Sequence, residues 1–266
     1  MHLTGLKMII NRHKRKVRIY MRYKELTFEG RNAVIEAFRS GKTIDKLFIL
    51  DGCQDGPIKS IVREAKKTST IINYVDKERL DRLANTGHHQ GVVAIGAAYE
   101  YAEVEDILEA ARSKGEAPFI FVLDEIEDPH NLGAIIRTAN LAGAHGVIIP
   151  KRRAVGLTAT VAKTSAGAIN YTPVAKVTNI ANTIEALKKE GLWFVCADMG
   201  GETMYNLDLK GPIGLVIGNE GNGVSRLVKE KCDFVASIPM KGDIDSLNAS
   251  VAAGVMAFEI VRQRMV

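Results

Sequence analysis

Three segments in the C-terminal half of the chain combine glycine with side chains that can form hydrogen bonds. They comprise residues 131–139, 217–223 and 238–250. Polar groups at the edge of a core are costly unless they are satisfied, so such segments usually mark a site. Each segment follows an apolar run, and ligands of open parallel sheets bind beyond the carboxyl ends of the strands. We therefore expect the three segments to meet at one site.

The first segment offers an amide and a guanidinium. Arg137 lies on an otherwise apolar stretch, and its planar fork suits a phosphate or ribose-phosphate contact, with a surface ion pair as the alternative. Asn131 is also a good N-cap for the helix expected from residue 131 to 142. Its residue type alone leaves a capping role and a site role open.

The second segment is rich in glycine but has the wrong spacing for a dinucleotide fingerprint. Gly218, Gly221 and Gly223 give G-x-x-G-x-G, and they follow the fourth expected strand and not the first strand of a βαβ unit. A nucleotide-dependent oxidoreductase is therefore disfavoured. The glycines would let a flat ligand approach main-chain groups. Glu220 could fix the loop, bind a polar ligand group, or simply be solvated.

The third segment opens the last expected helix, residues 247–264. Ser246 could be its N-cap. Asn248 would then lie in the first turn, where nothing structural requires an asparagine. Leu247 could supply an apolar wall or a main-chain N–H to a ligand.

Basic and imidazole side chains elsewhere are candidates for RNA contact. Lys151, Arg152 and Arg153 follow a strand on the same side as the three segments, although a solvated face is the alternative. His88 and His89 form either a polar turn or an RNA contact. Two adjacent histidines do not make a metal site without cysteine or carboxylate partners, so we expect no metal.

The elements that must position these residues follow from periodicity. Near-continuous apolar runs at 119–123, 146–149, 192–197, 213–217 and 234–238 fit a parallel sheet buried on both faces. Helical segments at 131–142, 158–168, 180–190, 225–231 and 247–264 alternate with them. The pattern predicts a parallel α/β domain over residues 118–266, with helices on both faces.

A smaller α/β unit is expected over residues 23–98. Its helices should span 30–41, 57–67 and 76–84, and its strands 46–50, 70–75 and 91–95. Residues 99–117 are charged and form a connector with a helix at 104–112. Residues 1–22 are set apart as a basic leader, either a disordered tail, an upstream extension or a nucleic-acid-binding arm.

Composition limits the class of protein. The 266 residues are 46% hydrophobic and 25% charged, which is ordinary for a globular protein. Seven of the 36 lysines and arginines lie in residues 1–22, so 29 basic residues face 31 acidic ones in the rest. The sequence contains neither an apolar run long enough for a membrane helix nor a signal-peptide core. The three cysteines lack metal spacing, and we expect a cytoplasmic protein with structural thiols.

Taken in order, N-x-G-x-x-x-R-T-A, G-N-E-G-x-G and I-P-M-x-G-x-x-x-S-L-N-x-S-x-A resemble the SpoU (TrmH-like) family of SPOUT methyltransferases. These enzymes methylate the ribose 2′-hydroxyl of RNA with S-adenosylmethionine. The stretches from Phe28 and from His89 are similar to the small RNA-binding domain, itself similar to ribosomal proteins, of the bacterial members that modify guanosine in 23S rRNA.

The resemblance implies a trefoil-knotted C-terminal domain and a homodimer acting on RNA, most of all 23S rRNA. It places catalysis on Asn131, Arg137, Glu220, Ser246 and Asn248. It implies that S-adenosylmethionine binds between the three segments, with the positions Gly218, Asn219, Gly221, Ile238, Met240 and Leu247. RNA contact then falls to Arg31, His88, His89, Lys151, Arg152 and Arg153.

Two other functions remain open beside this one. The same chemistry on tRNA or on another rRNA nucleotide is the nearer alternative. A non-catalytic RNA-binding protein that keeps the fold is the more distant one, and the complete set of family positions argues against it.

Overall fold

The computed structural model describes residues 26–244 and 246–265, which form two compact units. The first unit holds the described residues up to Glu100 together with Gly156–Ala159. The second holds Tyr101–Val155 and the chain from Thr160 onward. The basic leader lies outside the described residues. Each unit is described by itself.

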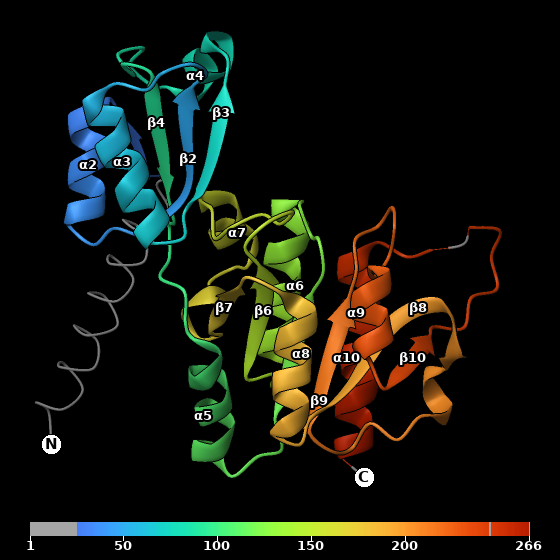
Figure 1. Cartoon of the computed structure of the whole chain (residues 1–266). Helices are drawn as coiled ribbons and strands as arrows, with labels where there is room; N and C mark the ends of the chain where they lie inside the picture. The colour runs from blue at the N-terminus through green and yellow to red at the C-terminus, as the bar shows by residue number, and fades with distance from the viewer. Residues whose placement is uncertain (1–25, 245, 266) are drawn as a thin grey trace, which may run out of the picture. The chain divides into compact units, whose positions relative to one another are not determined.

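The first unit is built on a four-stranded sheet in the order β1-β4-β2-β3 (Figure 1). Its strands are β1 (Leu26–Glu29), β2 (Ile44–Leu50), β3 (Ile71–Val75) and β4 (Val92–Gly96). β2 pairs parallel with β3, whereas β4 runs antiparallel to both β1 and β2. β1 was not among the predicted strands.

The helices of this unit begin where the sequence supplies caps. The carboxylate of Asp55 accepts a hydrogen bond from the N–H of Ile58 at 3.2 Å, at the start of α3 (Gly56–Lys67). Asp76 caps α4 (Lys77–Leu83) as predicted, at 2.7 Å from the Arg79 nitrogen. α2 (Arg31–Arg39) and α3 cover one core, while α4 contacts β2 and β4 and buries Leu80.

The second unit confirms the predicted parallel sheet. Six strands lie in the order β10-β8-β9-β5-β6-β7, and every pair is parallel. They are β5 (Phe119–Leu123), β6 (Gly146–Pro150), β7 (Val174–Val177), β8 (Trp193–Thr203), β9 (Ile213–Ile217) and β10 (Phe234–Ser237). β5, β6 and β9 are buried throughout, which explains their unbroken apolar sequence. The short edge strand β7 was not predicted.

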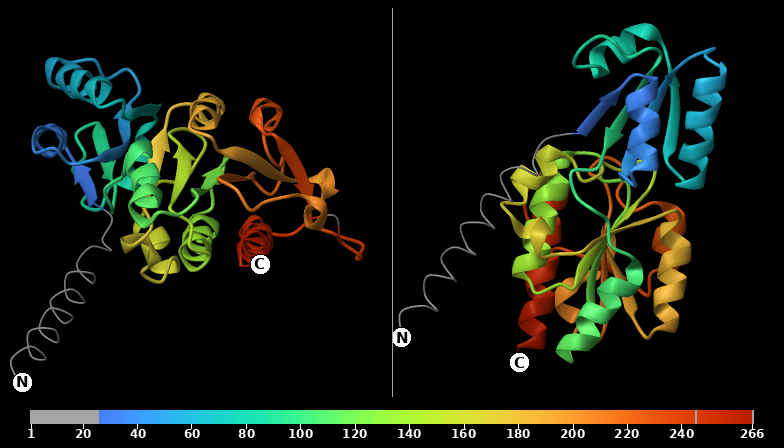
Figure 2. Two further views of the ribbon diagram at one scale, coloured as in Figure 1. Left: turned by 90° about the horizontal axis from the view of Figure 1, so that it is seen from below. Right: turned by 90° about the vertical axis from the view of Figure 1, so that its left-hand side faces the viewer.

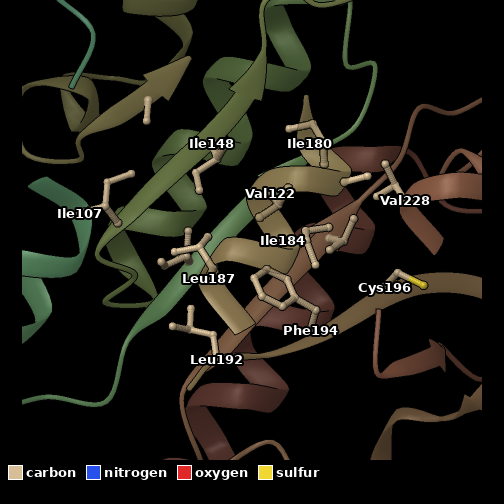
Figure 3. Close-up of a cluster of buried hydrophobic side chains, with 14 of the residues drawn as sticks. Ile107, Val122, Ile148, Ile180, Ile184, Leu187, Leu192, Phe194, Cys196 and Val228 are labelled. Atoms are coloured by element: carbon tan, nitrogen blue, oxygen red, sulfur yellow. The ribbon is translucent and has the colours of Figure 1, made fainter. Parts of the chain in front are cut away.

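Helices cover both faces of this sheet (Figure 2). α5 (Val104–Lys114), α8 (Ile180–Lys189) and α9 (Arg226–Lys231) share one apolar core with the strands, and Ile107, Ile184 and Val228 meet Val122 and Phe194 there (Figure 3). α6 (Pro129–Leu141) and α10 (Ala249–Arg264) contact each other on the opposite face. The short α7 (Ala159–Thr164) and two 3₁₀ turns, Ala168–Asn170 and Met204–Asn206, complete the unit.

β8 departs from regular pairing at the end that concerns the site. Its partner β10 pairs Val235 with Cys196 but Ala236 with Glu202, so residues 197–201 are left out of the ladder. Gly201 lies close against this break, because a Cβ there would sit 2.4 Å from the Val235 carbonyl oxygen. The predicted strand ended at 197 and did not include this irregular stretch.

The described helices include none that is both long and apolar enough to cross a membrane. Within the same residues, histidine, cysteine and carboxylate side chains do not gather in groups of three that could hold a metal ion.

Candidate active site

The three predicted segments meet through a hydrogen-bonded trio of side chains. Asn131 stands in α6 after β5, Glu220 follows β9, and Asn248 follows β10. The Asn248 amide nitrogen donates to Glu220 Oε1 at 2.7 Å and to Asn131 Oδ1 at 3.0 Å. The Asn131 amide nitrogen in turn donates to Glu220 Oε1. Three side chains from three separate segments of the chain therefore hold one another in a fixed arrangement.

The position of Asn248 in this trio corrects the sequence-based prediction for the start of α10. Asn248, and not Ser246, is the N-cap, because its Oδ1 accepts from the Ser250 nitrogen at 2.9 Å and the Val251 nitrogen at 3.3 Å. The cap fixes which end of the amide faces the helix. The Nδ2 end is thereby aimed at Glu220 and Asn131, so one side chain caps the helix and joins the site.

The capping role considered for Asn131 belongs to Asp128. The Asp128 carboxylate accepts from the His130 nitrogen at 2.8 Å, and Asn131 lies inside the first turn of α6. Asn131 is buried. A buried amide needs partners, and here the partners are the other two members of the trio. The structure thus assigns its hydrogen bonds to the site.

The glycine loop after β9 folds back on itself. Asn219 and Gly223 exchange main-chain hydrogen bonds of 3.2 and 2.9 Å, and Asn219 Oδ1 accepts from the nitrogens of Gly221 and Asn222. A Cβ on Gly218 would lie 2.1 Å from the Gly223 carbonyl carbon, so no larger residue fits there. The Asn219 side chain therefore serves the loop itself.

A buried carboxylate that the sequence analysis did not single out joins two of the segments. Asp124 directly follows β5, and its Oδ2 accepts from the Ser225 nitrogen at 2.7 Å. Its own main-chain nitrogen donates to the Ile217 carbonyl at 2.8 Å. Asp124 thus fastens the end of β5 to the chain on both sides of the glycine loop.

A cavity of about 300 Å³ opens between the glycine loop, the break in β8 and the start of α10. All six positions predicted for the cofactor line it, namely Gly218, Asn219, Gly221, Ile238, Met240 and Leu247. Glu220 and Ser246 line it as well. Two lining residues that sequence reasoning missed, Asp198 and Met199, come from the irregular stretch of β8. Both directly follow the expected strand 192–197, so their place at its carboxyl end was the available signal.

Asp198 places a negative charge in this cavity. Burial alone would raise the pKa of its carboxyl group, but the Lys229 ammonium at 3.0 Å and the Gly200 N–H at 3.1 Å together lower it below its ordinary value. The carboxylate is therefore ionised at neutral pH. Such a group is suited to hydroxyl groups or to a cationic ligand.

Arg137 is exposed on α6 and is not joined to the trio. Across residues 26–244 and 246–265, its guanidinium forms neither a hydrogen bond nor an ion pair, and it is not among the residues that line the cavity. Within the described chain, neither Ser246 nor Asn248 forms a hydrogen bond with Arg137. The guanidinium is instead available to an external phosphate.

The basic segment after β6 is partly engaged. Arg153 forms an ion pair with Glu125 at 2.8 Å, although its side chain is largely exposed. Its pKa is raised by the hydrogen bond to Glu125. Arg152 is exposed and Lys151 half-buried. Contact with RNA by these three residues stays a prediction.

In the first unit, the candidates divide into exposed and structural ones. His89 is buried, with Nε2 at 2.9 Å from Asp81 and Nδ1 accepting from the Gly91 nitrogen at 3.0 Å, so both ring nitrogens are used internally. His88 is exposed. Arg31 bonds to Asp55 at 2.5 Å and to the Gln90 carbonyl at 3.2 Å. The turn thus offers His88 to a ligand and keeps His89 for the fold.

Two known protein families match this chain, and the two matches correspond approximately to the two units of the structure. Residues 118–258 match the SpoU rRNA Methylase family. Residues 28–102 match the family described as RNA 2′-O ribose methyltransferase substrate binding. The two matches cover the catalytic candidates and the small α/β unit respectively.

Relatives cover nearly the whole chain. A putative TrmH family tRNA/rRNA methyltransferase from Bacillus subtilis is 53% identical over 236 residues, which is 88% of this chain and 94% of the relative. A protein of the same description from Staphylococcus saprophyticus is 49% identical over 241 residues, covering 90% and 96%.

Solved structures agree on the fold. The SpoU methyltransferase AviRb from Streptomyces viridochromogenes, solved in complex with AdoMet, has a TM-score of 0.57 at 26% identity and covers 91% of each chain. An AdoMet-bound rRNA methyltransferase from Sinorhizobium meliloti has a TM-score of 0.55 at 25% identity, covering 95% and 90%. The predicted fold class, an α/β SPOUT domain with a small N-terminal α/β domain, is confirmed, and the chain belongs to the SpoU rRNA Methylase family.

Proposed function

We propose that this protein transfers a methyl group from S-adenosylmethionine to a ribose 2′-hydroxyl of RNA, and that the acceptor is a guanosine of 23S rRNA. The observation that carries the proposal is the Asn131–Glu220–Asn248 trio beside the cavity of the glycine loop. Membership of the SpoU family supports the methyl transfer. The similar structure of AviRb with AdoMet supports the cofactor.

The cavity fits S-adenosylmethionine in size and chemistry. Its volume of about 300 Å³ is at the lower end for small-molecule sites. Gly218 and Gly221 line the cavity without side chains, so a flat ring can approach their main-chain N–H and C=O groups. Ile238 and Leu247 offer apolar walls, and ionised Asp198 offers an acceptor for ribose hydroxyls or a counter-charge for a sulfonium.

The bound cofactor supplies a methyl group on a positively charged sulfur, which is already activated toward a nucleophile. The protein must then align the ribose oxygen with that methyl and help remove the hydroxyl proton. The trio fixes the three loops that surround the acceptor position. Ser246 lines the cavity and can hydrogen-bond the ribose.

Arg137 is assigned to the RNA phosphate next to the acceptor ribose. Its exposed guanidinium has no partner among the described residues, and a guanidinium binds phosphate with two parallel hydrogen bonds. An arginine is normally protonated, so it acts as the base only if that phosphate takes its proton. Otherwise it positions the ribose while another group removes the proton.

The proposed identity of the RNA substrate depends on the first unit. Its match to a substrate-binding family supports RNA recognition outside the methyltransferase domain. The relatives carry the description tRNA/rRNA, so tRNA is the alternative to 23S rRNA.

A homodimer forms part of the proposal. α6 and α10 contact each other and leave Leu141, Val251 and Phe258 exposed, at 66%, 49% and 50% of their surfaces. Val251 and Phe258 are two helical turns apart and thus share one face of α10. A second copy of the chain would cover this apolar face.

The direct test is transfer of tritiated methyl from S-adenosylmethionine to unmodified 23S rRNA, 16S rRNA and tRNA. We expect label in 23S rRNA, recovered as 2′-O-methylguanosine. Arg137→Ala should reduce the rate by roughly 10²–10⁴ while cofactor binding is kept. Label in tRNA alone would overturn the substrate, and full activity of Arg137→Ala would overturn the role of Arg137. The absence of label with bound cofactor would favour a non-catalytic RNA-binding protein.

A further inference from the structure

We propose that the outer side of α3 and the neighbouring Tyr74 form a second RNA contact, which takes an unpaired nucleotide and its flanking phosphates. The proposal rests on the proposed RNA substrate and adds a site that the sequence motifs do not contain. We call it the α3 groove and define it by Lys59, Val62, Arg63, Lys66 and Tyr74, which line a hollow of about 580 Å³ in the first unit.

The floor and wall of the α3 groove suit a base. Ile58 is buried and Val62 half-buried beneath the hollow. Tyr74 is 56% exposed. It lies two residues after Ile72, which packs on the core below α2 and α3, so its ring projects on the same side of the sheet as α3. An exposed ring over a hollow is suited to stacking with an unpaired base.

The rim of the α3 groove suits phosphate. Lys59, Arg63 and Lys66 are spaced by four and three residues, so they form one stripe along α3. All three are exposed, and none pairs with a carboxylate in the part of the chain that the structure describes. Their neighbours are engaged, since Lys67 pairs with Glu64 at 2.7 Å and Arg31 with Asp55 at 2.5 Å.

The charge around the α3 groove, together with the Tyr74 ring, favours RNA over other ligands. Asp51 also lines the hollow, but its carboxylate accepts from the adjacent Gly52 nitrogen within its own turn. Three cations therefore face one acid around an aromatic ring. Positive charge alone would attract any polyanion, whereas the ring adds a preference for bases. RNA with unpaired nucleotides satisfies both features.

Binding by the full chain provides the test. The probe is a fluorescent single-stranded oligouridylate of about 12 nucleotides, within the usual site size for single-strand binding, compared with its duplex. We expect Tyr74→Ala to weaken single-strand binding by about 5- to 150-fold, as for a lost base–aromatic stack, and Tyr74→Phe to restore it. Lys59→Gln, Arg63→Gln and Lys66→Gln should each reduce the salt slope by about 0.7.

Lys42→Gln is the matched control, because Lys42 is an exposed lysine of the same unit outside the α3 groove. The proposal is overturned if Tyr74→Ala binds as tightly as the wild type, if Lys42→Gln weakens binding as much as the groove variants, or if the duplex binds better than the single strand. Displacement by polyglutamate as effective as by RNA would also overturn it.

Methyl transfer separates this proposal from the proposed function. If both hold, groove variants raise KM for RNA and leave KM for S-adenosylmethionine unchanged, because none of these residues lines the cofactor cavity. The α3 groove alone is overturned if the wild type transfers methyl and the groove variants have the same KM for RNA and the same RNA affinity as the wild type. Wild type that transfers no methyl but binds RNA through Tyr74 overturns the proposed function alone.

Discussion

Asn248 serves two functions through the two ends of one amide. Its oxygen caps α10, and its nitrogen joins Glu220 to Asn131. A serine retains an oxygen for the cap but has no amide nitrogen to reach the site. Substitution of Asn248 by serine can therefore disturb the geometry of the trio while leaving most of the stability of α10 in place.

We expect Asn248→Ala to lower the free energy of unfolding by about 1 kcal/mol, the usual cost of a lost N-cap. Asn248→Ser should keep most of that stability. Both variants should lose methyl transfer by about 10²-fold, because a small displacement of aligned groups is costly in rate. Urea unfolding and tritiated methyl transfer measure the two effects. A serine variant with full activity would contradict the role assigned to the amide nitrogen.

The residues of the trio could be named from the sequence, but their contacts could not. Asn131, Glu220 and Asn248 belong to motifs with fixed spacing, so the resemblance identified them. Asp198 lies in no motif and lines the cavity from the stretch of β8 that is left out of the pairing with β10. Asn219 lines the cavity at a position expected for the cofactor, while its side chain accepts from the loop's own nitrogens. The partners of these side chains depend on tertiary hydrogen bonds, which the spacing of residues in a sequence motif does not specify.

At the scale of elements, apolar patterning predicted the buried strands and β10 but missed the short edge strands β1 and β7. β5, β6 and β9 are buried on both faces and give unbroken apolar sequence. β1 and β7 have four residues each and lie at sheet edges. β10 is equally short and also lies at an edge, but its expected run 234–238 is almost entirely apolar, whereas Lys176 interrupts β7 and Thr27 and Glu29 interrupt β1.

The turn between α6 and β6 carries a pH-sensitive contact. His145 is buried, its Nδ1 accepts from the Phe119 nitrogen at 3.1 Å, and its Nε2 lies 3.0 Å from Glu116. Burial lowers the pKa of His145, and Lys114 and Arg264 add to this, against the opposing effect of Glu116. Protonation of Nδ1 would remove the acceptor for Phe119 at the start of β5.

The unfolded chain therefore binds this proton more readily than the folded one. The contribution of His145 to stability is complete above the unfolded pKa of about 6.5 and is lost as the pH falls toward the lower folded pKa. We expect His145→Asn to flatten the decline of the unfolding free energy below about pH 6.5. Denaturant unfolding across pH measures this, with His130→Asn as the exposed control. An unchanged slope in His145→Asn would contradict it.

At the scale of the whole molecule, the chain outside the basic leader has no positive excess, yet its proposed partner is a polyanion. Binding must then depend on where cations remain unpaired. Some described cations are engaged by an acid, as Arg153 is by Glu125, whereas Arg137, Lys59, Arg63 and Lys66 are not. Local pairing, and not net charge, therefore indicates which surfaces can meet RNA.

The second unit exposes apolar side chains on α6 and α10, namely Leu141, Val251 and Phe258. We expect the wild type to sediment as a dimer at micromolar concentration and Phe258→Asp to sediment as a monomer. Full burial of a phenylalanine contributes roughly 1.5–3 kcal/mol, and Phe258 is half exposed, so covering it twice in a two-fold interface should raise the dissociation constant of the variant by about 10–10². Leu227→Asp is the control, since Leu227 is 53% exposed on α9, which packs on the opposite face of the sheet. A monomeric wild type, or a Leu227→Asp variant that dissociates equally, would show that α6 and α10 do not join two copies of the chain.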